Sequence, residues 1–287
     1  MKLSAAPALL AKCFACLAVA SLTISGAGAQ SKLERILKDK KMVLGYMDGG
    51  KPFGYTDEKG NVLGWSVDLS KAIHKTIEKK FNTPIDLQLA LVTPQTRIPP
   101  VSNGTVDFVL ASTGITLERM DAVDFSMIHN AVCVNMLHRK KLALRSYADL
   151  RGRRVGVPGG GVEEKVLTDM GKNGKINPPP KMTAYTSMAN AFLALDQGKV
   201  DVYVTSAPAL ISARQNAKNP DDWVVDGPDL FCISNGIILP QNDSKWTTTV
   251  NKALCYLITT GEFQNIYDDW FKGKFRHRRA FAQGNAR

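Results

Sequence analysis

Short apolar and β-branched runs alternate with helical patterns along most of this chain. Strand-type runs occupy residues 42–46, 85–91, 106–111, 131–137, 155–157 and 200–205. Apolar residues recur at helical spacing in residues 69–77, 188–195 and 246–257, and Gly198 and Gly261 follow the last two of these helices. Such repeated alternation predicts an α/β protein with mostly parallel sheets covered by helices.

The first 29 residues have a different character. Lys2 and Lys12 are basic, no acid precedes Glu34, and an apolar stretch at 13–24 leads to Ala27-Gly28-Ala29. These are the parts of a secretory signal peptide, so we predict cleavage after Ala29 and a periplasmic location. The apolar stretch is too short for a membrane anchor, and no later run of about 20 apolar residues would suit a polytopic membrane protein.

The chain is basic, with a formal net charge of +11. Apart from residues 276–279, within a basic tail at 276–287, the positive charge is dispersed, and no strip of interleaved aromatic and basic residues suited to single strands occurs. We therefore expect no nucleic-acid partner. A basic surface would still attract an anionic ligand.

Seven short motifs follow one another along the chain. They lie at residues 51–55, 60–69, 103–108, 116–126, 149–157, 198–201 and 268–271. Together they resemble the polar amino-acid-binding proteins of ABC importers, solute-binding protein family 3, over residues 31 to 273. Residues 93–99 and 219–223 are most similar to the glutamate/aspartate-binding branch.

The resemblance implies a type II periplasmic binding protein fold. Two α/β lobes would be joined by two crossing strands, near 131–137 and 231–239, with the ligand cleft between them and closure on ligand. The domains would be a signal peptide (1–29), lobe one (30–134), lobe two (135–230), a return to lobe one (231–275) and the tail (276–287). Nothing in the sequence suggests a coiled coil or an exposed apolar helix, so we expect a monomer.

Arg119 is the first candidate ligand-binding residue. A guanidinium matches a carboxylate with two hydrogen bonds, and the resemblance assigns Arg119 to the ligand's α-carboxylate. Ser112 and Gly114, just after the strand at 106–111, would add a hydroxyl and a backbone N–H. The alternative for Arg119 is a surface salt bridge with Glu118 or Asp121.

Arg97 is the second basic candidate. Thr93 would cap a short helix with Pro94 in its first position, which places Arg97 one turn on. The resemblance assigns Arg97 to a side-chain carboxylate of the ligand, and a solvent-facing arginine is the alternative. Phe53 is a candidate for the cleft wall, although aromatic residues in such segments are more often core.

In lobe two, Gly160 and Gly161 precede a helix, and free N–H groups at a helix start bind anions. Glu163 and Glu164 provide an alternative, because acids in the first turn satisfy the same dipole. Ser206 falls where the family carries an aspartate for the ligand's α-amino group, and Gly161-Val162 replaces two threonines.

These departures, together with Met47 in place of a branch-specific arginine, leave two ligand types open. One is a carboxylate without an amine, held by Arg119 and Arg97. The other is an amino acid whose ammonium meets an acid not yet located, with Asp48 as a candidate.

The sequence thus predicts an extracytoplasmic solute-binding protein that delivers an amino acid or related small carboxylate to a membrane permease. We expect no enzyme activity and no cofactor. His74, His129, His138 and His277 lack metal-site spacing. The alternative is an exported enzyme on the same scaffold, such as a cyclic-acid dehydratase, which needs a general acid or base in the cleft. Cys133, Cys232 and Cys255 allow at most one disulfide, and the first two fall in the crossing strands.

Overall fold

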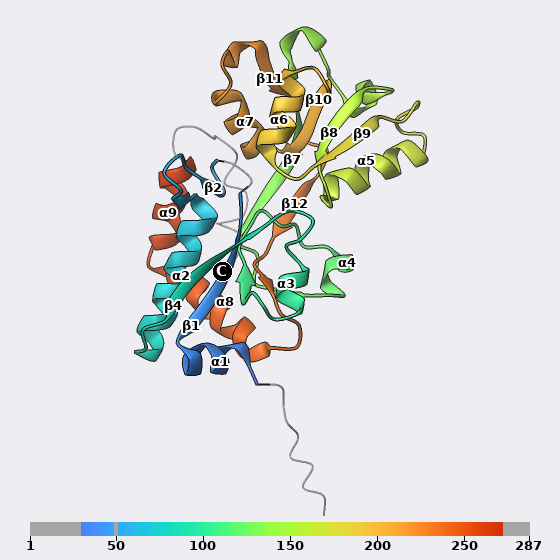
Figure 1. Ribbon diagram of the computed structural model, residues 1–287. Helices are drawn as coiled ribbons and strands as arrows, with labels where there is room; N and C mark the ends of the chain where they lie inside the picture. Colours follow the sequence, from blue (N-terminus) through green and yellow to red (C-terminus); the bar gives the residue numbers. More distant parts are fainter. Residues whose placement is uncertain (1–29, 49–50, 272–287) are drawn as a thin grey trace, which may run out of the picture. The chain divides into compact units, whose positions relative to one another are not determined.

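The computed structural model describes residues 30–48 and 51–271 (Figure 1). The predicted signal peptide and basic tail lie outside these described residues. None of the helices in the described ranges combines the length and hydropathy needed to cross a bilayer.

The first sheet has five strands in the order β4-β1-β5-β13-β6. Its strands are β1 (Lys41–Met47), β4 (Asp86–Val92), β5 (Phe108–Val109), β6 (Asp124–Phe125) and β13 (Ile238–Leu239). Strand β1 pairs parallel with β4 and β5, whereas β13 is antiparallel to its neighbours β5 and β6. The helices of this lobe are α1 (Lys32–Asp39), α2 (Trp65–Phe81), α3 (Pro99–Ser102), α4 (Leu117–Met120), α8 (Ser244–Thr259) and α9 (Glu262–Phe271).

The second sheet is built on β7 (Asn130–Arg139), and its main path runs β11-β7-β10-β8-β9. The other strands are β8 (Arg154–Pro158), β9 (Lys181–Tyr185), β10 (Val202–Ser206), β11 (Trp223–Asp226) and β12 (Cys232–Asn235). Strands β10, β8 and β9 pair in parallel, while β11, β12 and β10 are antiparallel to β7. The helices here are α5 (Val162–Lys172), α6 (Met188–Asp196) and α7 (Ala207–Gln215).

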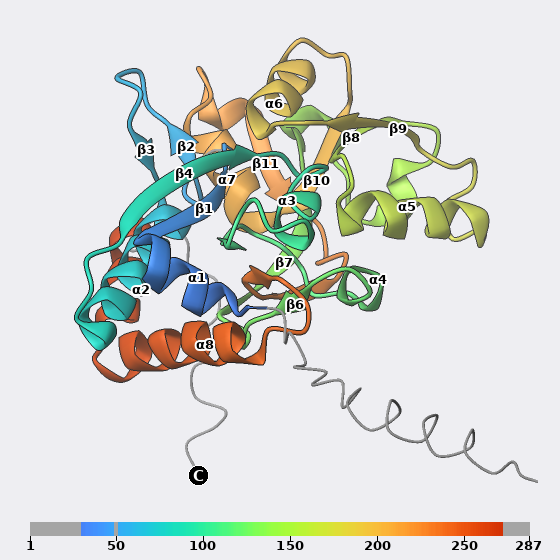
Figure 2. The ribbon, with the colours of Figure 1, turned by 60° about the horizontal axis from the view of Figure 1, so that its bottom comes forward.

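The core of the first lobe lies where α2 contacts both α8 and β1 (Figure 2). Leu69, Ile73 and Ile77 of α2 are fully or almost fully buried, and their spacing places them on one face of the helix. Trp246 and Leu254 of α8 complete this cluster. The sequence pattern at 69–77 therefore correctly identified a core-facing helix.

Two of the family-like motifs are joined by the start of α2. The hairpin of β2 (Tyr55–Thr56) and β3 (Val62–Leu63) already pairs Tyr55 of the first motif with Leu63 of the second. The N–H of Trp65, the first residue of α2, adds a hydrogen bond to the carbonyl of Pro52 at 2.8 Å. Gly64 has φ 132°, and a Cβ there would lie 2.3 Å from the Phe53 carbonyl oxygen, so only glycine fits.

Asp107, in the motif at 103–108, has a structural role. Its side chain is almost fully buried, accepts a hydrogen bond from the Val43 N–H at 2.8 Å, and pairs with Lys32 and Arg35. Its carbonyl accepts from the Trp246 indole N–H at 3.0 Å. One residue thus fastens α1, β1 and α8 together.

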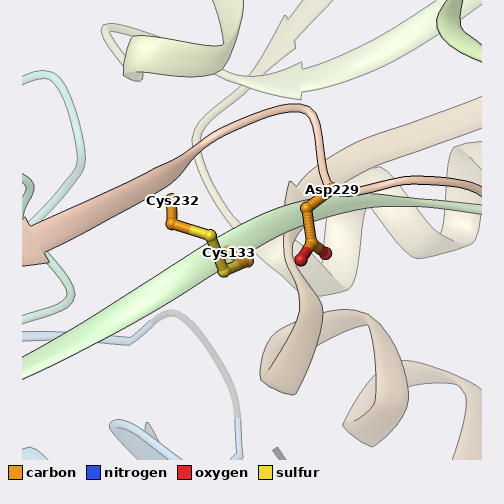
Figure 3. A group of neighbouring side chains, drawn as sticks. All are labelled: Cys133, Asp229 and Cys232. Atoms are coloured by element: carbon orange, nitrogen blue, oxygen red, sulfur yellow. A yellow bond between two sulfur atoms is a disulfide. The ribbon is translucent and has the colours of Figure 1, made fainter. Parts of the chain in front are cut away.

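Strands β7 and β12 run antiparallel between the lobes, with Cys133 opposite Cys232. Figure 3 shows the disulfide that joins these two cysteines, with Asp229 nearby. The side chain of Asp229 accepts a hydrogen bond from the Asn135 amide at 3.2 Å. Cys255 is free and exposed. These three cysteines therefore form one disulfide and leave one free thiol, which is the arrangement that the sequence allowed.

Some predictions of local structure were wrong. The helix expected to begin at Pro94 is absent. Residues 94–96 form a turn in which the Thr96 N–H donates a hydrogen bond to the Thr93 carbonyl, and the short helix α3 starts only at Pro99. A helix begun at Pro94 could not continue, because the ring of Pro99 would clash with the carbonyl four residues earlier. Ordered pairing in the predicted strand at 106–111 is limited to Phe108–Val109, and the sheets are mixed rather than mostly parallel.

Candidate ligand-binding site

A cleft lies at the ends of strands from both sheets. Its lining includes Met47, Pro158, Tyr185 and Ser206, which are the last residues of β1, β8, β9 and β10. Carboxyl ends of parallel strands are where α/β folds bind ligands. The predicted site residues that line this cleft are Phe53, Arg97, Ser112, Gly114, Arg119, Gly161 and Ser206.

Arg119 reaches the cleft from the one-turn helix α4, whose N-cap Thr116 accepts from the Arg119 N–H. Its Nη1 donates to the Gly114 carbonyl at 2.7 Å, and its Nη2 donates to the Gly160 carbonyl at 3.0 Å. Neither predicted alternative partner, Glu118 or Asp121, forms an ion pair with it in the part of the chain that the structure describes. Three of the five guanidinium N–H donors stay available for an anion.

Arg97 is more deeply placed, with only 5% of its surface exposed. Its Nη1 points to the sulfur of Met47 at 3.6 Å, and its Nε has no hydrogen-bond partner. Among the described residues no carboxylate lies within ion-pair distance of it. Burial, together with the nearby charge of Arg119, lowers the pKa of Arg97 to about 9. A buried cation without a partner is costly, so this side chain is suited to receive an anion.

Neutral polar groups complete the first lobe's contribution. The hydroxyl of Ser112 accepts from the Asn235 amide at 3.4 Å, and both residues line the cleft. The Asn235 Oδ1 and the Ser66 hydroxyl are buried without partners among the described residues. These groups were not identified from the sequence, apart from Ser112.

The aromatic residues divide between wall and core. Phe53 lines the cleft and also makes edge contacts with Trp65 and Phe271, so it belongs to the cleft wall and to the core. Trp65 is fully buried. Phe53 thus joins the ligand cleft to the first lobe's core.

The glycine loop before α5 differs from its predicted role. The Gly160 N–H donates to the Glu164 carboxylate at 3.0 Å, and the Gly160 carbonyl accepts from Arg119. Glu164 therefore satisfies this N–H, as the alternative interpretation of the sequence held, and Gly160 contributes through its carbonyl. Gly161 lines the cleft.

Glu163 is the functional candidate that the sequence analysis missed. It is the second residue of α5 and lines the cleft. Its Oε1 accepts a hydrogen bond from the Thr205 hydroxyl at 3.2 Å. The residue as a whole is partly exposed, yet burial of the carboxyl group raises its pKa, an effect that the facing Arg97 and Arg119 oppose. Asp48, the acid suggested earlier, is exposed and is not among the described lining residues.

The described residues contain one cluster with metal-ligand types, formed by Cys133, Asp229 and Cys232 (Figure 3). Both of its sulfur atoms are in the disulfide. A metal needs thiolates, so this cluster is a crosslink rather than a metal site.

Residues 42–273 match the model of the bacterial extracellular solute-binding proteins, family 3. The chain belongs to this family. The glutamate/aspartate import solute-binding protein of Salmonella typhimurium is 31% identical over 246 residues, 85% of this chain and 80% of that protein. The L-glutamate/L-aspartate-binding protein of Pseudomonas aeruginosa is 33% identical over 242 residues, 83% and 79% of the two chains. The predicted family and nearest branch are confirmed.

Solved structures of this family also match. An ancestral amino acid-binding protein, described as a precursor of cyclohexadienyl dehydratase, superposes with a TM-score of 0.73 at 25% identity. The match covers 85% of this chain and all of that chain. The type II binding-protein fold predicted from the sequence is therefore confirmed.

Proposed function

We propose that this member of family 3 is the extracytoplasmic solute-binding component of an ABC importer. It would bind an amino acid or a related small carboxylate and deliver it to the membrane permease. The observation that carries the proposal is the pair of arginines, Arg97 and Arg119, that face one cleft without an acid partner within ion-pair distance among the described residues. Two guanidinium groups in a largely apolar cleft are a strong carboxylate-binding arrangement.

The proposed ligand contacts follow from this geometry. Arg119 would bind the α-carboxylate and Arg97 a second acidic group, with Ser112, the Gly114 and Gly161 backbone and Ser206 around them. Phe53 would supply the apolar wall. The two relatives are named for glutamate and aspartate, which agrees with a ligand that carries two carboxylates.

A thermal-shift screen over amino acids and dicarboxylic acids, followed by calorimetry, tests the proposal. A ligand that binds only the folded state raises the melting temperature in proportion to its concentration and affinity. Stabilisation by at least one amino acid or small carboxylate is expected. If amides and sugars stabilise the protein and carboxylates do not, the proposal is wrong.

An exported dehydratase is the second candidate. Such an enzyme needs a general acid or base in the cleft, and Glu163, with its raised pKa, is a group of the kind that acid catalysis needs. The relatives reported above are named as binding proteins, and we propose binding without turnover. Product formation from prephenate or arogenate, abolished in Glu163→Gln, would favour the enzyme instead.

We further propose a periplasmic monomer with lobe one at 30–134 and 231–275 and lobe two at 135–230. Exported protein should begin at Gln30, which intact-mass measurement can check. Small-angle scattering should show compaction on ligand saturation without a change in mass. Retention of residues 1–29 in the exported protein would contradict the cleavage site. A dimer at micromolar concentration would contradict the monomer.

A further inference from the structure

Three charged side chains are found among the described residues that line the cleft: Arg97, Arg119 and Glu163. The two arginines account for the binding of carboxylates. Neither the proposed function nor the family resemblance assigns a role to the third. Glu163 is the one acid in this lining, so it decides whether the cleft can accept a positive charge.

Glu163 and its neighbour Glu164 have separate tasks. Glu164 turns back and accepts from the Gly160 N–H at the start of α5. Glu163 instead extends to β10, where its carboxylate accepts a hydrogen bond from the Thr205 hydroxyl at 3.2 Å. Within the described ranges, no lysine or arginine nitrogen lies within 4.0 Å of its carboxylate. Glu164 thus binds the loop that precedes α5, whereas Glu163 lines the cleft.

The charged and titratable groups that face Glu163 come from three elements. Arg97 follows β4, Arg119 lies on α4, and Tyr203 lies on β10 beside Thr205. The arginines are close enough to influence the carboxyl electrostatically but do not pair with it directly. An ionised carboxylate that is withdrawn from water without a cation in direct contact is costly, so this side chain is suited to receive a positively charged group.

We propose that Glu163 binds the ammonium group of the ligand, and that the cleft therefore selects acidic α-amino acids over plain dicarboxylic acids. This inference rests on the proposed function. Two guanidinium groups and one carboxylate are the electrostatic complement of two carboxylates and one ammonium. A ligand that lacks the amine would place two negative charges beside an ionised or newly protonated Glu163.

The position of Glu163 also accounts for Ser206. Thr205, which holds Glu163, immediately precedes Ser206 at the carboxyl end of β10, and both residues line the cleft. An acid carried by α5 thus reaches the strand end from the neighbouring element. A hydroxyl at position 206 is then sufficient, because a second carboxylate there would repel Glu163.

Calorimetry with two matched ligand pairs tests the proposal. L-glutamate and L-aspartate would be compared with glutarate and succinate, which lack only the amine, on wild type, Glu163→Gln and the control Asp169→Asn. Asp169 is an exposed acid on the same helix and does not line the described cleft. We expect Glu163→Gln to weaken the binding of L-glutamate or L-aspartate about 30-fold or more. The binding of the corresponding deaminated acid should be unchanged or improved. Asp169→Asn should bind like wild type.

A second measurement on wild type does not depend on the variant's folding. An ammonium beside Glu163 favours its ionised form, so binding of the amino acid should release protons and strengthen as pH rises through the pKa of the free protein. Binding of the deaminated acid should instead be accompanied by proton uptake, because its added negative charge favours the protonated form of Glu163. Titrations in buffers of different ionisation enthalpy give the sign of the proton exchange, and the titration of the free ligand, measured without protein, is subtracted.

The outcomes separate the two proposals. Equal weakening of a ligand and its deaminated partner in Glu163→Gln, or tighter wild-type binding of glutarate or succinate, would overturn the role of Glu163 and leave carboxylate binding intact. If wild type binds none of the four acids, both the proposed ligand class and this inference fail.

Discussion

The guanidinium of Arg119 donates a hydrogen bond to the carbonyl oxygen of Gly160 at 3.0 Å, although the two residues are 41 positions apart and lie beside different sheets. The first turn of α5 adds an exposed ion pair between Lys165 and Glu118 at 3.0 Å. Exposed ion pairs contribute about 0–1 kcal/mol, so this pair adds little to the contact. Arg119 thus serves both the cleft and the contact between its two walls.

Arg119→Ala is expected to abolish most ligand binding. It removes a charged partner of a partly desolvated carboxylate, which costs about 2–5 kcal/mol, or roughly 30- to several-thousand-fold in affinity. Arg119→Lys should be nearly as harmful, because an ammonium cannot reproduce the planar fork. Calorimetry with L-glutamate and L-aspartate gives the affinities. Arg145→Ala, at an exposed arginine outside the described cleft, is the control, and wild-type affinity in Arg119→Ala would contradict the site assignment.

The part of the site that the sequence predicted depends on local motifs. Arg119, Ser112 and Gly114 lie within a few residues of one strand end, so a short pattern carries their geometry. Glu163 could not be assigned in the same way. Two adjacent glutamates in a first helical turn are equally suited to cap it, and the choice depends on Thr205, 42 residues away.

The fold shows the same division. Strands β1, β4 and β7 and helix α2 follow patterns that periodicity detects. Helix α7 was missed because Pro208 lies in its first turn and its residues are buried on most sides, which removes the amphipathic pattern. Helix α9 was not predicted either, although a helical pattern is present there. Its apolar residues recur at helical spacing, at Phe263, Ile266, Tyr267 and Trp270.

Removal of the disulfide should destabilise the protein. The Cys133–Cys232 bond closes a segment with a sequence separation of 99 residues, and native disulfides of this kind contribute about 2–5 kcal/mol. The double variant Cys133→Ala/Cys232→Ala should therefore unfold at lower urea concentration, whereas Cys255→Ala should not. Thiol titration of the denatured, unreduced exported protein should give one thiol per chain. Three thiols would show that the bond does not form.

Asp107→Ala should lower stability without direct loss of a ligand contact. It leaves the partly buried Val43 N–H without its acceptor and removes the link between α1 and β1, for an expected cost of about 1–3 kcal/mol. Asp39→Ala removes a weaker and more exposed partner of Arg35 and should change stability by less than about 0.5 kcal/mol. Urea denaturation measures both variants. Equal effects would show that burial of Asp107 does not matter.

His129 should make the protein sensitive to acid. Its ring is buried 5.5 Å from the centre of Trp65, and neither ring nitrogen has a hydrogen-bond partner among the described residues. Burial lowers its pKa to about 4, although the nearby Gly236 backbone weakly favours protonation. The unfolded chain, with a pKa of about 6.5, binds the proton first, so stability falls as pH drops from about 6.5 toward 4.

Between pH 7 and pH 5 this single group should remove about 2 kcal/mol of unfolding free energy. His129→Phe keeps an aromatic ring against Trp65 but cannot titrate. Between pH 7 and pH 5 this variant should therefore lose about 2 kcal/mol less unfolding free energy than wild type. Urea unfolding at the two pH values, followed by tryptophan fluorescence, measures the difference. Because other groups titrate alike in both proteins, the comparison isolates the imidazole. Parallel losses in the two proteins would mean that His129 is not the group that takes up the proton.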